Sequence, residues 1–167
     1  QIFAFDRSPQ RVATMRRMLE TRGVRNVTAE AKNFLRVDPA DPAYAQVSHM
    51  LLDPSCSSSG MSARPHAHPD ALRELSENQF QVVMAALRFP AVRRVVYSTC
   101  SIFEEENERV VQRVLEAAGG AFELDHALPW WHRRGVGNFE GARLCVRADH
   151  ADGTIGFFLA VFRRVGE

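Results

Sequence analysis

VVYSTCS, residues 95–101, is an apolar run that turns polar at Ser98 and then reaches a cysteine. A second segment, HMLLDPSCSSSG (residues 49–60), has the same order: an apolar run, then Asp53, then Cys56 in a serine-rich turn. Short apolar runs of this kind are typical of buried strands, and open α/β sheets bind ligands at the carboxyl ends of their strands. The two segments therefore predict an α/β sheet whose edge carries two thiols and a carboxylate.

Strand-like and helix-like segments alternate on both sides of these two segments. Ser8 and Pro9 are typical of a helix start, and Gly23 and Pro90 of helix ends. We expect strands over residues 2–5, 24–29, 47–52, 93–97 and 121–124, helices over 9–22, 71–89 and from Ser101 to Gly119, and a long loop over 54–70.

The carboxyl-terminal part has a different pattern. Asp152-Gly153 is a turn signal between two strand-like segments, 143–147 and 154–164, and predicts an antiparallel hairpin. Together with the alternating elements before it, this hairpin predicts an α/β fold. We expect a mostly parallel sheet with helices on both faces and one antiparallel edge.

The composition is that of a globular domain. The chain of 167 residues, with 46% hydrophobic and 25% charged residues, is long enough for one domain with a real core. No apolar run is long enough to span a bilayer, so we expect no membrane partner. A net charge of +1 does not by itself indicate nucleic acid. Three cysteines without a CxxC pair favour free thiols in a reducing compartment.

Cys100 is the best candidate for a nucleophile. Ser101 and Glu104 have the spacing of a capping box, which predicts that Cys100 lies at a helix N-terminus. Unpaired main-chain N–H groups and the helix dipole favour a thiolate there. The competing interpretation, with about equal weight, is a small cysteine that only packs in the core.

Asp53 and Cys56 have two possible uses. A carboxylate at a strand end can accept hydrogen bonds from the amine or ring N–H of a bound base, or it can simply cap the loop. Two thiols could also hold a metal ion, but His49, His66 and His68 lack the spacing of a zinc site. We therefore expect no metal.

Asp6 and Arg11 match a pattern of nucleotide-binding folds. Asp6 ends the first visible strand, where an acidic residue can bind ribose hydroxyls, and Arg11 lies one turn into the next helix. Many strands end in Asp, so this signal is weak by itself.

The two cysteine segments resemble the signature segments of the NOL/NOP/Sun RNA cytosine-5 methyltransferases. DPSCSSSGM (residues 53–61) and YSTCS (97–101), followed by EENE (105–108), carry the resemblance, and GFFLA (156–160) is similar to the last strand of that family. The sequence of residues 53–61 is most similar to that of the subtype-5 branch, which modifies large-subunit rRNA. The resemblance covers nearly the whole chain and implies a Rossmann-like fold that uses S-adenosylmethionine as its cofactor.

The resemblance implies a role for each candidate residue. Cys100 attacks C6 of a flipped-out cytosine, C5 then takes the methyl group, and Cys56 assists proton removal at C5 or release of the enzyme. Asp53 holds the base beside the cofactor methyl group, while Asp6 binds the cofactor ribose with support from Arg11. The implied partner is rRNA, and the implied location is the nucleus and nucleolus, with the cytoplasm as the alternative.

Three departures from the family pattern bear on these roles. The chain begins within a strand, so we expect the first strand and the glycine-rich cofactor loop to be missing and residues 1–167 to be a partial catalytic domain. Ser58 stands where the family has Gly, which costs stability if the position needs a positive φ. Asn33 stands where an acidic residue contacting adenine is usual, and Asn can still accept a hydrogen bond.

These departures leave other functions open. A catalytically inactive fragment or isoform could act as an RNA-binding or scaffold module. A small-molecule methyltransferase fits the two cysteines less well. Trp130 and Trp131 could stack on bases, but we favour a hydrophobic anchor under a loop.

Overall fold

The computed structural model describes residues 1–62 and 65–166. Residue contacts divide the chain into two compact units, Gln1–Pro39 and Ala40–Glu167. Residues 63–64 of the predicted loop over 54–70 lie outside the described residues.

The first unit is a strand–helix–strand motif. Strands β1 (Ile2–Asp6) and β2 (Val27–Ala31) pair in parallel, and helix α1 (Pro9–Thr21) connects them. The Ser8 side chain caps the helix by accepting the Arg11 N–H, and Gly23 ends it at φ +68°, as predicted. A short 3-10 helix, η1 (Phe34–Arg36), follows β2.

Strand β2 starts at Val27, later than the predicted range of 24–29. The Val24 N–H completes the end of helix α1 by binding the Leu19 carbonyl (2.9 Å), so this residue is not available to a strand. The position of the strand start therefore follows from the geometry of the helix end.

The second unit contains the remaining helices and strands of the described chain. The longer elements are β3 (His49–Leu52), α2 (Pro69–Leu87), β4 (Arg94–Thr99), α3 (Glu108–Ala118), β5 (Phe122–Asp125), β6 (Val146–Ala148) and β7 (Phe157–Arg164). The short 3-10 helices are η2 (Pro42–Tyr44), η3 (Ser59–Met61), η4 (Glu104–Glu106), η5 (Glu140–Leu144) and η6 (His150–Asp152).

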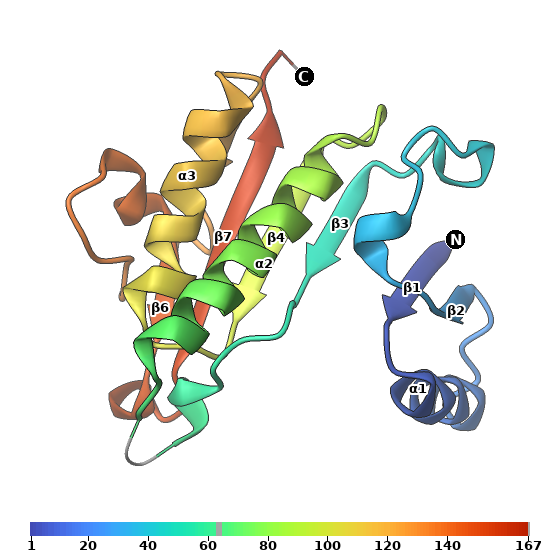
Figure 1. Ribbon diagram of the computed structural model, residues 1–167, viewed down its shortest axis with the longest axis horizontal. Coiled ribbons are helices and arrows are strands. Elements are labelled where there is room, and N and C mark those ends of the chain that lie inside the picture. Colours follow the sequence, from blue (N-terminus) through green and yellow to red (C-terminus); the bar gives the residue numbers. More distant parts are fainter. Residues whose placement is uncertain (63–64, 167) are drawn as a thin grey trace. The chain divides into compact units, whose positions relative to one another are not determined.

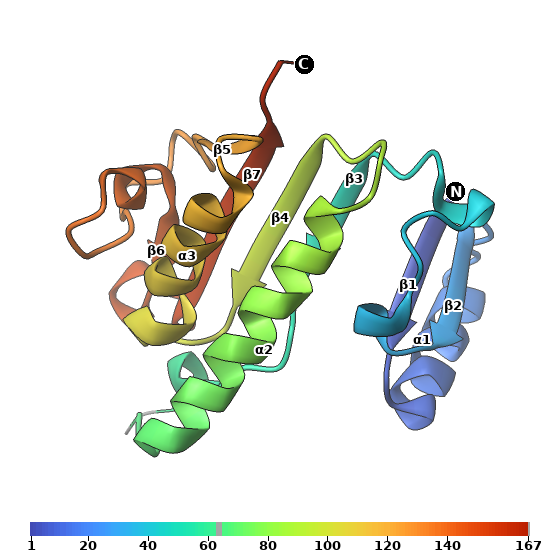
Figure 2. The same ribbon diagram turned by 45° about the horizontal axis from the view of Figure 1, so that its top comes forward.

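The sheet of the second unit is mixed. Its strand order is β3-β4-β7-β5, and β6 also pairs with β7. The parallel pairing predicted for the two cysteine-bearing strands is present between β3 and β4, whereas β7 is antiparallel to β4, β5 and β6. Antiparallel pairing thus extends through the middle of the sheet instead of being limited to one edge. Helices α2 and α3 lie on the same face of this sheet (Figures 1 and 2), so the predicted two-sided covering is not seen within this unit.

The core forms where alternate strand residues meet the two helices. Phe158, Ala160 and Phe162 of β7 are fully buried, as a period of two requires for a strand with one covered face. Val83 of α2 and Val110 of α3 are also fully buried. This packing fixes β4 and β7, and it thereby fixes the edge at which Cys100 leaves the sheet.

One local prediction beside the sheet is wrong, and another is confirmed. The helix expected from Ser101 starts later, because the 3-10 helix η4 (Glu104–Glu106) comes first and α3 begins only at Glu108. The Ser101 hydroxyl accepts the Phe103 N–H (3.1 Å) and donates to Glu106 Oε2 (2.5 Å). The predicted antiparallel hairpin is present as the pairing of β6 with β7, and η6 lies in the connection between the two strands.

Trp130 and Trp131 differ in their surroundings, and the predicted role as a hydrophobic anchor holds for only one of them. Trp131 is an anchor, since its indole Nε1–H donates to the Arg147 carbonyl (2.7 Å). Trp130 is 79% exposed, so the anchor interpretation is wrong for this residue.

Candidate active site

The two cysteine sulfurs lie side by side at one edge of the second unit's sheet. The Cys56 and Cys100 Sγ atoms are 3.3 Å apart. Their strands explain this: β3 and β4 are parallel neighbours with Leu52 opposite Tyr97, so both chains leave the sheet at the same edge. Two thiols far apart in sequence therefore share one position.

Cys56 is a thiol at neutral pH. Burial raises the pKa of Cys56 from 9.0 to about 11. Main-chain N–H groups of Ser58 and Cys100 hydrogen-bond to its sulfur and lower this pKa, while the Cys100 thiol raises it. Its S–H is therefore available to donate to the Cys100 sulfur.

Cys100 follows β4 directly and is partly exposed. Its Sγ also lies 3.5 Å from the Ser58 hydroxyl. Because α3 starts at Glu108, the structure does not place the predicted helix N-terminus at this thiol. Its polar neighbours are instead the Cys56 thiol and the Ser58 hydroxyl.

Asp53 directly follows β3 (His49–Leu52), so it lies at the sheet edge where the chains leading to Cys56 and Cys100 leave β3 and β4. Partial burial raises the pKa of Asp53, and a hydrogen bond with the Ser98 hydroxyl lowers it. The second unit thus brings Asp53, Cys56 and Cys100 to the same sheet edge, as the sequence predicts.

Two glycines hold the cysteine loops against the start of β7. The Gly60 N–H donates to the Cys100 carbonyl (2.9 Å), and the Gly156 N–H donates to the Gly60 carbonyl (2.9 Å). A Cβ on Gly60 would lie 2.1 Å from the Gly156 carbonyl oxygen, so only glycine fits there. Ser58 has φ +55°, so this position does need a positive φ, and Ser in place of the family's Gly costs stability there.

Glu106 belongs to this site but was not among the predicted residues. Its side chain is fully buried, and it accepts hydrogen bonds from the Ser57 N–H and the Ser101 hydroxyl, each next to one of the cysteines. The sequence shows only a run of three glutamates, 104–106, and nothing in that run distinguishes the buried one.

The remaining predicted residues lie in the first unit. The Asp6 carboxylate accepts the Ser8 N–H (2.7 Å) and pairs with Arg11 Nε (3.0 Å). Asn33 caps η1, with its Oδ1 accepting the Leu35 N–H (3.1 Å).

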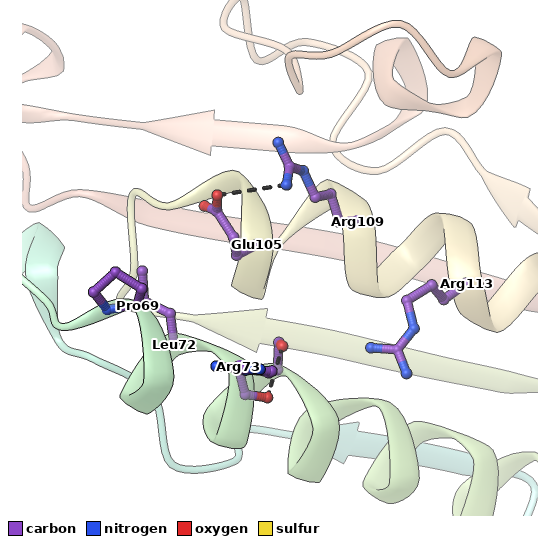
Figure 3. A pocket seen from close by; sticks show the side chains of 7 residues that line it. Pro69, Leu72, Arg73, Glu105, Arg109 and Arg113 are labelled. Atoms are coloured by element: carbon purple, nitrogen blue, oxygen red, sulfur yellow. Dashed lines mark hydrogen bonds and ion pairs between the residues drawn. The ribbon is translucent and has the colours of Figure 1, made fainter.

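A separate cleft of about 340 Å³ lies between α2 and the start of α3 (Figure 3). Its lining includes Arg73, Arg109 and Arg113, and each of these guanidinium groups pairs with a carboxylate. Figure 3 shows the pair between Arg109 and Glu105. The cysteines do not line this cleft.

Metal-binding clusters and membrane-spanning helices are both absent from the described chain. No group of three or more His, Cys, Asp or Glu side chains within residues 1–62 and 65–166 could hold a metal ion. In the same residues, no helix has the length and apolar character needed to cross a bilayer.

Comparison with known proteins identifies the family. The profile of the family described as 16S rRNA methyltransferase RsmB/F matches residues 1–163. The chain belongs to this RsmB/F family. The resemblance to NOL/NOP/Sun methyltransferases is thereby confirmed. Individual relatives and a solved structure are similar to the chain as well.

Two curated relatives of this RsmB/F chain carry rRNA methyltransferase names. The Mus musculus 28S rRNA (cytosine-C(5))-methyltransferase is 44% identical over 172 residues, covering 98% of this chain and 37% of the relative. The Schizosaccharomyces pombe 25S rRNA (cytosine-C(5))-methyltransferase rcm1 is 39% identical, covering 95% of this chain and 38% of the relative. The chain thus spans less than two-fifths of the length of either relative.

A solved structure supports the fold. NSun6 from Pyrococcus horikoshii, solved with SFG, has a TM-score of 0.77 and 25% identity, covering 100% of this RsmB/F chain and 42% of that chain. The predicted Rossmann-like methyltransferase fold is confirmed.

Proposed function

We propose that this chain is the part of an rRNA cytosine-5 methyltransferase that carries its two catalytic cysteines. The proposal depends above all on the 3.3 Å approach of the Cys56 and Cys100 sulfurs at the carboxyl ends of two parallel strands. The rRNA (cytosine-C(5))-methyltransferase names of its relatives supply the substrate class, with large-subunit rRNA as the specific target. S-adenosylmethionine supplies the methyl group when it is bound.

Cys100 is the proposed nucleophile. Its thiolate forms a bond to C6 of cytosine, and the electron pair that this bond displaces makes C5 nucleophilic enough to take the methyl group. A water molecule then takes the C5 proton, the electron pair of the C5–H bond restores the C5–C6 double bond, and the C6–S bond breaks to release the Cys100 thiolate. Attack requires an unstacked base, because C6 cannot be reached inside a helix.

Cys56 is proposed to act in release of the enzyme. Its sulfur lies 3.3 Å from that of Cys100, so its S–H can give a proton to the Cys100 sulfur as that sulfur leaves C6. Asp53 is proposed to hold the amine and ring N–H of the base.

Asp6, Arg11 and Asn33 are proposed to bind the cofactor within the first unit. The Asp6 carboxylate ends a parallel strand just before the start of α1, the place where nucleotide-binding folds hold a ribose. Arg11 fixes the orientation of this carboxylate through their ion pair. Asn33 Oδ1 caps η1 with one lone pair, and its second lone pair can accept a hydrogen bond from adenine.

Covalent trapping tests the nucleophile. Large-subunit rRNA fragments containing 5-azacytidine should form a stable adduct with the wild-type protein and none with Cys100→Ala. Cys56→Ala should accumulate adducts on ordinary RNA, because release is impaired. Equal trapping by wild type and Cys100→Ala would exclude Cys100 as the nucleophile.

Calorimetric titration with S-adenosylmethionine tests the cofactor residues separately. We expect micromolar binding that Asp6→Asn weakens about tenfold, as loss of a charged hydrogen bond does. A folded chain that neither binds the cofactor nor traps RNA would favour the inactive scaffold instead. Fluorescence microscopy of the tagged full-length protein tests the proposed nucleolar location against a cytoplasmic one.

A further inference from the structure

The Glu106 carboxylate is a fully buried acceptor of three hydrogen bonds. Its Oε1 accepts the Ser57 N–H (2.9 Å) and a Gln79 Nε2–H (2.9 Å). Its Oε2 accepts the Ser101 hydroxyl at 2.5 Å. The hydroxyl of Tyr97 also fixes its main chain by donating to the Glu106 carbonyl (2.5 Å).

The three donors come from the segments that carry the cysteines or from the helix beside them. Ser57 follows Cys56, and Ser101 follows Cys100. Gln79 of α2 donates both to Glu106 and to the carbonyl of Ser55 (3.0 Å), so main-chain groups on both sides of Cys56 are held. One carboxylate therefore connects the two loops to each other and to α2.

The hydroxyl groups around Glu106 strengthen this connection. The Ser57 hydroxyl lies 3.1 Å from that of Ser59 and 3.2 Å from that of Ser101, and the Ser59 and Ser101 hydroxyls are 3.2 Å apart. The Ser59 hydroxyl also accepts the Ile102 N–H (3.0 Å). The hydrogen bonds of the Glu106 carboxylate go to Ser57, Ser101 and Gln79 and not to either sulfur, so its effect on the thiols passes through the residues beside them.

We propose that Glu106 is a positioning residue that holds the Cys56 and Cys100 sulfurs within reacting distance. A carboxylate suits this role because all its partners are donors, and a glutamine in its place would direct an NH₂ group at one of them. The inference deepens the proposed function and rests on it, but it concerns the distance between two thiols and can be measured without methyl transfer.

Equilibrium with glutathione provides that measurement. The reaction converts the Cys56 and Cys100 dithiol and oxidised glutathione into the protein disulfide and two molecules of reduced glutathione. Its equilibrium constant is the effective concentration of one thiol at the other, which mass spectrometry after alkylation quantifies. Cys145 is fully buried, and peptide mapping distinguishes it from the pair.

We expect Glu106→Gln to lower the effective concentration about tenfold or more, as displacement of positioned groups does. Glu105→Gln is the matched control, because this adjacent glutamate is 42% exposed and pairs with Arg109; it should leave the constant unchanged. Ser101→Ala removes one of the three links and should lower the constant severalfold. In a protein active in methyl transfer, Glu106→Gln should lower kcat and leave the KM for S-adenosylmethionine unchanged.

Circular dichroism establishes whether each variant is folded. If folded Glu106→Gln and Ser101→Ala both keep the wild-type constant, the proposal is wrong. If Glu106→Gln does not fold, the Ser101→Ala comparison decides, with an unchanged constant again overturning the proposal. If RNA trapping fails but Glu106→Gln still lowers the equilibrium constant with glutathione, only the methyltransferase assignment is rejected, and the positioning role of Glu106 stands.

Discussion

At the scale of single residues, Gly60 leaves no room for a side chain. A Cβ there would overlap the main chain of Gly156, which belongs to a different loop and is not a flexible side chain. We expect Gly60→Ala to lower the free energy of unfolding by about 3 kcal/mol, at the upper end of overpacking costs. Denaturant titration gives this value.

Gly119 provides the control for this substitution. It has φ +57°, and no atom lies within 4 Å of the position that a Cβ would take. Alanine there therefore meets only the left-handed backbone cost of roughly 1 kcal/mol. Equal losses for Gly60→Ala and Gly119→Ala would mean that the contact with Gly156 does not constrain the cysteine loop.

The thiol of Cys56 gives the protein a pH dependence on the alkaline side. Its pKa is 9.0 ordinarily and about 11 in the folded protein, so the unfolded chain loses this proton first as the pH rises. The stability that Cys56 contributes is therefore complete below pH 9 and is lost between pH 9 and pH 11.

We expect wild type to lose more stability than Cys56→Ser across this interval, because serine does not titrate there. Urea titrations at a series of pH values measure the difference. Parallel pH profiles for the two proteins would contradict the raised pKa.

The limits of sequence-based prediction are also visible at the residue scale. Cys56, Cys100 and Asp53 were predictable because each follows an apolar run, and parallel neighbouring strands must deliver their ends to one edge. Glu106 was not, because its burial depends on Ser57 and Gln79, which are distant in sequence. Two neighbouring glutamates with identical side chains are partly exposed.

At the scale of elements, a buried ion pair joins α3 to β6. Arg147 Nε and Nη2 donate to the two carboxylate oxygens of Glu108, each at 2.6 Å, and the side chains are 13% and 2% exposed. We expect Arg147→Ala or Glu108→Ala to cost about 3–5 kcal/mol, because either leaves a buried charge without its partner.

The double variant should cost much less than the sum of the two single variants, and a double-mutant cycle in urea measures this coupling. The exposed pair of Arg113 and Glu77 is the control, with an expected coupling below about 1 kcal/mol. Additive losses at Glu108 and Arg147 would show that the pair does not join the two elements.

The elements also show where sequence patterns succeed and fail. Apolar runs predicted the strands to within a few residues, since burial on a sheet requires them. The helix expected at Ser101 begins at Glu108 instead, after the 3-10 helix η4 (Glu104–Glu106), whose Glu106 side chain is buried and accepts the Ser101 hydroxyl. Local spacing could not reveal this buried contact.

At the scale of the whole molecule, the second unit contains its own core and the Cys56–Cys100 pair. We expect residues 40–167 alone to unfold cooperatively and to keep the glutathione equilibrium of the whole chain, because every residue of the Glu106 network lies within this unit. Calorimetry and the thiol assay check this. If this fragment lacks a cooperative transition, the second unit does not fold independently of residues 1–39.

Strand β7 has a consequence for synthesis. It is the pairing partner that β4, β5 and β6 share, yet it follows all of them in the chain. At about 5–20 residues per second, roughly 60 residues separate the end of β4 from β7, a delay of roughly 3–12 s. During that interval the N–H and C=O groups that β4 will share with β7 have no partner strand, so newly made chains are exposed to strand pairing with one another until β7 has been synthesised.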